Sequence, residues 1–215
     1  MEQRIARIFS TAWRAAVVLL TLEIAAVSLL RYLTSLDPPP PPVVANAFAD
    51  PFLVIHVVAG VIALLAGPVQ FIRRVRERRP ALHRVTGRIY VAACLVAGPS
   101  ALVLALGTTA GPVAGAGFAI PALLLPVFTW FGWRTAVRRR FAEHREWMLR
   151  SYALTATAIT LRLMLPAAGF LGIAFLPAYQ VIAWISWMTN LALVEYRIRS
   201  TRASVPPSHR ILAPA

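Results

Sequence analysis

The chain has 215 residues, of which 59% are hydrophobic and only 14% are charged, and its mean hydropathy is +0.68. A soluble domain needs more polar surface than this composition supplies, so a soluble globular fold is excluded. The 22 basic residues are all arginine and give a net charge of +14. Because they flank apolar stretches, they favour anionic inner-leaflet lipids over nucleic acid as partners. The single cysteine, Cys94, excludes a disulfide framework and a thiolate-rich zinc site.

Arginine gathers in four clusters that are separated by long apolar stretches. Short loops rich in arginine stay on the cytoplasmic side of a membrane during insertion, so their order along a chain reports topology. The connections between alternate stretches are almost free of basic residues, which predicts that all four clusters are cytoplasmic. The clusters are Arg4/Arg7/Arg14, Arg73–Arg88, Arg134–Arg150 and Arg197–Arg210.

Six stretches come close to the length of about 20 residues that a helix needs to cross the hydrocarbon. They are residues 12–31, 52–72, 83–106, 113–133, 147–168 and 173–195, to within a few positions. Their even number places both termini on the cytoplasmic side of the inner membrane. We therefore expect an all-α, polytopic membrane helix bundle with six transmembrane helices. Residues 1–196 form one domain in this prediction, followed by a disordered basic tail at 197–215.

The first stretch resembles a secretory signal, because arginines precede an apolar run. The cleavage-like Ala45-Asn46-Ala47 lies too far beyond that run, so we expect a retained helix. Glu23 lies near its middle, where a lone ionised carboxylate would cost several kcal/mol. Arg162 is the basic residue at a suitable depth, so Glu23 and Arg162 are predicted to approach each other, directly or through water.

The second and third stretches each present polar residues on one helical face. His56 and Gln70 share a face in the second stretch, and His83, Tyr90 and Cys94 share one in the third. Small residues on these faces let another helix or a flat ligand approach the backbone closely. They are Gly60, Ala63, Gly67 and Gly87.

The fifth stretch carries a polar stripe at helical spacing, made by His144, Ser151, Thr155 and Arg162. At ~1.5 Å per residue, Arg162 lies in the outer half of the bilayer, too deep for its guanidinium to reach the cytoplasmic boundary. Tyr32 and Tyr179 fall near the outer boundary, as aromatic anchors do.

The sixth stretch is predicted to form a hydrogen-bonded seam of the bundle, in which its polar side chains bond to neighbouring helices. Its polar and indole-bearing residues are Gln180, Trp184, Trp187 and Asn190. Glu195 follows at the inner boundary, where we expect it to pair with a loop arginine.

Three segments in order resemble one family: F-L-V-I-H-V-V-A-G (52–60), A-L-H-R-V-T-G-R-I-Y (81–90) and H-R-E-W-M-L-R-S-Y (144–152). Together with I-T-L-R-L (159–163) and the W-x-x-N (187–190) and Glu195 end, they resemble bacterial predicted membrane proteins grouped as domain of unknown function 2306 (DUF2306). The resemblance covers about residues 50–196. It implies a multi-pass fold and no particular activity. The positions it singles out are His56, His83, His144, Arg84, Arg88, Arg145, Arg150 and Arg162.

Electron transfer with haem b is the first functional hypothesis. His83 and His144 both begin helices on the cytoplasmic side, where two imidazoles could ligate one haem iron. Gly87 would make room for the porphyrin, and the propionates would meet Arg84, Arg88 and Arg145. Alternatively, His83 and His144 are interfacial residues that hydrogen-bond carbonyls or phosphate headgroups.

The outer side suggests a different ligand, because His56 has no second histidine opposite it. A quinone headgroup near His56 and Arg162 is the expected substitute for a second haem. The competing hypotheses are a transporter or small-molecule-binding protein lined by Glu23, His56 and Arg162, and a non-enzymatic scaffold. Hydrolysis is not expected, because the sequence offers no nucleophile–base pair and no carboxylate pair at one depth.

Overall fold

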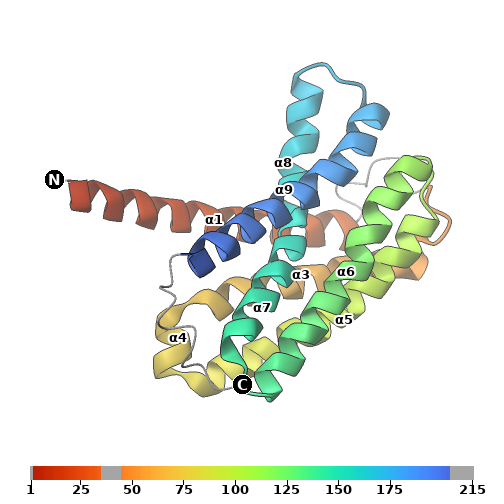
Figure 1. The fold of residues 1–215 in the computed structure, drawn as a ribbon. Helices are drawn as coiled ribbons and strands as arrows, with labels where there is room; N and C mark the ends of the chain where they lie inside the picture. The colour runs from red at the N-terminus through yellow and green to blue at the C-terminus, as the bar shows by residue number, and fades with distance from the viewer. Residues whose placement is uncertain (1, 35–44, 204–215) are drawn as a thin grey trace.

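The computed structural model describes residues 2–34 and 45–203, with side chains from Val18 onward, and all regular structure within them is helical (Figure 1). The all-α prediction is therefore confirmed. In chain order the helices are α1 (Glu2–Leu33), α3 (Ala49–Phe71), α4 (Arg73–Arg78), α5 (Pro80–Leu106), α6 (Pro112–Val137), α7 (Phe141–Thr155), α8 (Thr157–Phe170) and α9 (Phe175–Ala203).

Four stretches of the described chain are long and apolar enough to cross a membrane. Three are α3, α5 and α6, and the fourth is Phe141–Phe170, which combines α7 and α8. Only Ala156 separates these two helices, and its N–H still donates to the carbonyl of Tyr152 at 2.8 Å. The four correspond to the second to fifth stretches predicted above. The first and sixth stretches also form helices, α1 and α9, which are not among these four of the described residues.

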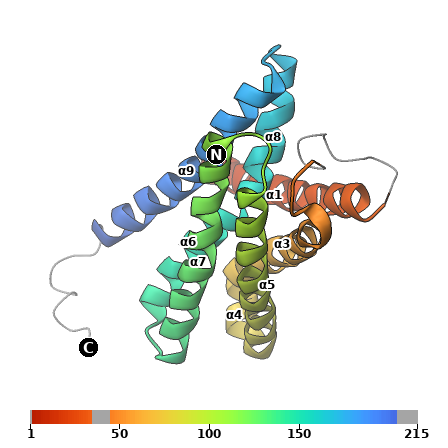
Figure 2. The same cartoon turned by 90° about the vertical axis from the view of Figure 1, so that its right-hand side faces the viewer.

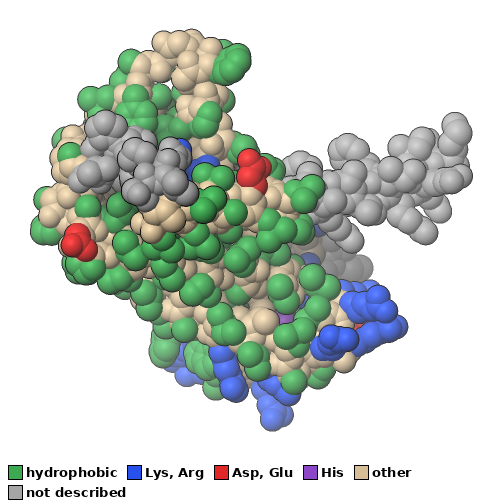
Figure 3. Space-filling view, turned by 180° about the vertical axis from the view of Figure 1, so that it is seen from behind, with side chains coloured by type: hydrophobic (Ala, Val, Ile, Leu, Met, Phe, Trp, Pro, Cys, Tyr) green, Lys and Arg blue, Asp and Glu red, His purple; other side chains and the backbone are tan. Residues whose placement is uncertain are grey.

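The spanning helices pack in sequence, α3 along α5, α5 along α6 and α6 along α7. Figures 1 and 2 show α5, α6 and α7 side by side, with the α8–α9 hairpin extending from one end of this group. α1 crosses the group and packs on α3 and α8. Arginine side chains gather at the opposite end, whereas apolar side chains cover much of the face between (Figure 3).

Short connections hold the helix ends together. Pro80 and Pro112 begin α5 and α6, where a missing backbone N–H costs nothing. Before α3, the Asn46 amide donates to the carbonyl of Leu104 at 2.7 Å. The N–H of Ala47 donates to the carbonyl of Gly107 at 3.1 Å. The start of α3 is thereby fixed beside the end of α5, which sets the depth of His56.

Hydroxyl groups join α5, α6 and α7 inside the bundle. The hydroxyl of Tyr90 lies 2.8 Å from that of Ser151 and 3.0 Å from that of Thr155. The hydroxyl of Thr129 lies 2.7 Å from that of Ser151. Tyr90 and Ser151 are 0% exposed. The predicted inward faces of the third and fifth stretches are thus confirmed here, and their polar groups are satisfied by one another.

The predicted disordered tail is wrong for residues 197–203. α9 continues to Ala203, and near its end Arg202 forms an ion pair with Glu146 of α7. This contact links positions 56 residues apart, so no local sequence signal announces it. Residues 204–215, the rest of that predicted tail, lie outside the described residues, as do the side chains of Arg4, Arg7 and Arg14.

Substitution by alanine is expected to have different effects on stability at two glycines of α3. A Cβ on Gly67 would overlap the ring of Tyr152, whereas a Cβ on Gly60 would meet no atom within 4 Å. Gly67→Ala should therefore lower the free energy of unfolding by about 1–3 kcal/mol through overpacking. Gly60→Ala should change it by no more than ~0.5 kcal/mol. Thermal midpoints in detergent compare the two variants, and equal effects would contradict this packing.

Candidate functional site

His56 on α3 is held by a hydrogen bond that fixes its tautomer. Its Nδ1 lies 3.0 Å from the carbonyl oxygen of Ala97 on α5. Because a carbonyl oxygen only accepts, Nδ1 must carry a proton and donate it. In the neutral ring Nε2 then keeps its lone pair, so this half-buried imidazole can accept a hydrogen bond or a proton there.

Arg162 on α8 approaches the same place. Its positive charge acts on the imidazole of His56. Its other titratable neighbours are Tyr32 and Arg31 on α1 and Tyr179 on α9. The guanidinium donates to the carbonyl of Ala158 at 3.2 Å. Among the described side chains, none forms an ion pair with Arg162.

We call His56, Arg162, Tyr32 and Tyr179 the His56–Arg162 cluster. Aromatic rings support one side of it, because the ring of Tyr179 stacks on that of Phe175, with centroids 5.3 Å apart, and lies 5.1 Å from that of Phe118. Open space adjoins Gly60, one turn along α3 from His56. From the sequence, Tyr32 and Tyr179 were predicted only to lie near the outer membrane boundary. Because Arg162 is also predicted in the outer half of the bilayer, this similar depth could have indicated that the three residues share a site.

The predicted direct contact of Glu23 with Arg162 is wrong, whereas a contact through water stays a prediction. Glu23 is exposed on α1, and no ion pair joins it to Arg162 in the described part of the chain. The reason is helical phase. Ala25 packs against α3, and two residues along a helix amount to a rotation of about 160° away from that face. Glu23 therefore does not line the site that contains His56 and Arg162.

His83, near the start of α5, and His144, near the start of α7, both lie at the arginine-rich end of the molecule. Nδ1 of His144 donates to the carbonyl of Gly132 at 2.8 Å. With the nitrogen and oxygen of the Gln70 amide assigned so that both have partners, the nitrogen donates to Nδ1 of His83 at 3.1 Å and the oxygen accepts from Thr86 at 2.6 Å. His144 thus makes a carbonyl hydrogen bond of the kind that the interfacial alternative expects, whereas the partner of His83 is a side-chain amide.

The surroundings of this pair do not fit a porphyrin. The space at Gly87, expected to admit the ring, holds the Gln70 amide at 3.1 Å from where a Cβ would lie. Arg84, Arg88 and Arg145 are all exposed. Haem b at His83 and His144 stays a prediction, without support from this geometry.

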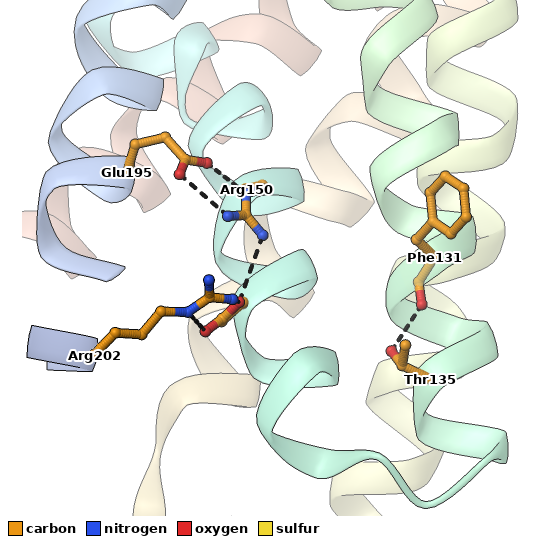
Figure 4. Close-up of polar contacts among 6 residues, drawn as sticks. Phe131, Thr135, Arg150, Glu195 and Arg202 are labelled. Atoms are coloured by element: carbon orange, nitrogen blue, oxygen red, sulfur yellow. Dashed lines mark hydrogen bonds and ion pairs between the residues drawn. The ribbon is translucent and has the colours of Figure 1, made fainter. Parts of the chain in front are cut away.

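Charged residues at the same end are paired with one another (Figure 4). Nε and Nη2 of Arg150 both donate to the carboxylate of Glu195, and the second bond is 3.1 Å long. Arg150 also lies 3.8 Å from Glu146, which binds Arg202. The predicted pairing of Glu195 is confirmed. A cavity of about 420 Å³ adjoins these residues, but because the charges around it are already paired, we assign it no ligand.

The sixth stretch forms the predicted seam. Gln180, Trp184 and Trp187 donate to backbone carbonyls of residues 110, 113 and 117 at 2.9, 3.0 and 3.1 Å. Asn190 donates to the carbonyl of Ala153 at 3.3 Å and accepts from Thr160 at 3.0 Å. Like Ser151 and Thr155, these residues hold helices together.

Comparison with known proteins identifies one family. The family model described as "Predicted membrane protein (DUF2306)" matches residues 53–198. That range includes every residue of the His56–Arg162 cluster except Tyr32. No curated protein and no solved structure matches the chain.

The ion pair between Arg150 and Glu195 predicts a dependence of stability on pH. Hydrogen bonding to Arg150 holds the pKa of Glu195 below its ordinary value. The stabilisation is therefore complete above the unfolded-state pKa of about 4.3 and is lost as pH falls through the lower folded-state value. Glu195→Gln should cost about 1–3 kcal/mol at pH 7 and flatten the acid side of a thermal-midpoint profile.

Glu77→Gln is the matched control for that profile, because Glu77 pairs with Arg73 on an exposed surface. Its effect should stay below about 1 kcal/mol at any pH. An unchanged acid profile in Glu195→Gln would show that Arg150 and Glu195 do not stabilise the packing of α7 on α9.

Proposed function

We propose, from the premise that this chain belongs to the Predicted membrane protein (DUF2306) family, that it binds the headgroup of a membrane-soluble quinone in the His56–Arg162 cluster. One observation carries the proposal: a guanidinium without a carboxylate partner among the described side chains is close enough to act electrostatically on an imidazole whose Nε2 keeps its lone pair. A quinone carbonyl accepts hydrogen bonds, as Arg162 requires. The hydroxyl of the reduced quinol donates them, as Nε2 of His56 requires.

The rest of the cluster suits a flat, largely apolar ligand. Sites for such molecules combine apolar and aromatic walls with a few converging polar groups. The stacked rings of Phe175 and Tyr179 provide such a wall, and the open space beside Gly60 provides access along α3. The isoprenoid tail would remain in the lipid.

The same proposal includes the full topology. α1 and α9 serve as first and sixth spans, with both termini on the arginine-rich, cytoplasmic side of the inner membrane. Two features support it. α1 packs along α3 through Ala25, Leu29 and Tyr32, and arginine is concentrated at one end of the molecule (Figure 3). The His56–Arg162 cluster then lies in the outer half of the bilayer.

Binding of decylubiquinone to the purified protein tests the proposal, with quenching of tryptophan fluorescence as the readout. Arg162→Gln and His56→Ala should each weaken binding about 10- to 100-fold, the equivalent of losing one hydrogen bond of about 1.5–3 kcal/mol. Arg88→Gln is the matched control, because Arg88 is an exposed arginine at the other end of the bundle.

Equal affinities in the three variants, with unchanged thermal midpoints, would refute quinone binding at this cluster. The visible spectrum of the same preparation addresses haem. We expect no Soret band, whereas a sharp band that disappears in both His83→Ala and His144→Ala would establish haem b at those histidines.

A further inference from the structure

Glu23 lies beside the middle of a membrane span and faces away from the protein. Its neighbour Ala25 is buried in one cluster with Val57 and Val61 of α3, and these two residues lie midway along Ala49–Phe71. Glu23 is thus at the depth of the bilayer centre. Its side chain is exposed, and no ion pair includes it in the described part of the chain.

Glu23 is also the centre of an apolar stripe. The exposed residues of α1 that lie within about 60° of it on the helical wheel form one continuous face. We call this face the Glu23 stripe: Leu19, Glu23, Ala26, Val27 and Leu30. Leu19 and Leu30, at its two ends, are 65% and 53% exposed. The opposite face of α1 is buried at Thr21, Ile24, Ala25 and Ser28.

A carboxyl group directed alone into hydrocarbon costs several kcal/mol, and ionisable side chains at this depth almost always face protein or water. The apolar residues of the stripe are suited to lipid, but Glu23 is not. Its cover must therefore offer hydrogen-bonding capacity at the same depth and an apolar surface above and below it.

We propose that a second copy of this chain provides that cover, through a parallel α1–α1 contact in which the two Glu23 carboxyls hydrogen-bond to each other. Copies inserted in the same direction are related by a two-fold axis along the membrane normal, so residues of equal depth meet. A protonated carboxyl donates and accepts, and is therefore complementary to its own copy. Ala26, one turn from Glu23, lets the helices approach closely. This contact does not depend on quinone binding.

Disulfide cross-linking in membranes tests the contact with two matched variants. Cys94 is the only cysteine of the chain, so Cys94→Ser gives a cysteine-free background. Ala26→Cys places a thiol in the Glu23 stripe, whereas Ala25→Cys places it one residue away on the face packed against α3. Oxidation with copper phenanthroline should produce a covalent dimer in Ala26→Cys and at least fivefold less in Ala25→Cys. Equal yields, or no dimer in either variant, would overturn the proposal.

The carboxyl itself is tested in the Ala26→Cys background. Glu23→Gln keeps a group that donates and accepts, so its cross-linking yield should stay within about twofold of the parent. Glu23→Leu keeps a side chain of similar size but can neither donate nor accept a hydrogen bond, so its yield of covalent dimer should fall severalfold. If Glu23→Leu cross-links as well as Glu23→Gln, apolar packing alone joins the helices and the proposed carboxyl pair is refuted. Retained quinone binding in Glu23→Leu would confirm that the two sites are separate.

Discussion

Hydrocarbon offers no hydrogen bonds, so each polar group inside this protein depends on another protein group for a partner. Tyr90, Ser151 and Thr129 meet this constraint together, because one set of hydroxyls bonds across three helices. Trp187 and Asn190 meet it by donating to carbonyls of α6 and α7. The relative positions of the helices follow from these bonds, since lipid competes with protein for apolar contacts but not for polar ones.

The described charged residues fall into two groups, those with a charged protein partner and those without one. At the arginine-rich end, Arg150 and Arg202 each bind a glutamate, so their charges stabilise the fold. Deeper in the molecule, Arg162 makes a single hydrogen bond to its own helix, and Glu23 faces outward. Among the described side chains, neither Arg162 nor Glu23 forms an ion pair with another helix. This difference leads us to assign a ligand to Arg162 and a second copy of the chain to Glu23.

The sequence predicted features that depend on local spacing. The lengths of the apolar stretches located α3, α5, α6 and the joined α7–α8 to within six residues at each end, and helical periodicity identified Ser151 and Thr155 as inward-facing. It could not predict features that depend on contacts between distant residues. The direction of Glu23 follows from how α1 packs on α3, and the space at Gly87 is filled from another helix by Gln70. α9 extends beyond residue 196 where Arg202 meets Glu146.

The most direct measurement is the ¹⁵Nε chemical shift of Arg162 in detergent-solubilised, ¹⁵N-arginine-labelled protein, assigned by its loss in Arg162→Gln. If a ligand satisfies this guanidinium, titration with decylubiquinone should move the Arg162 resonance and leave that of Arg150 unchanged. A stationary Arg162 resonance at saturating quinone, or equal shifts at both arginines, would contradict the assignment of the His56–Arg162 cluster as the binding site.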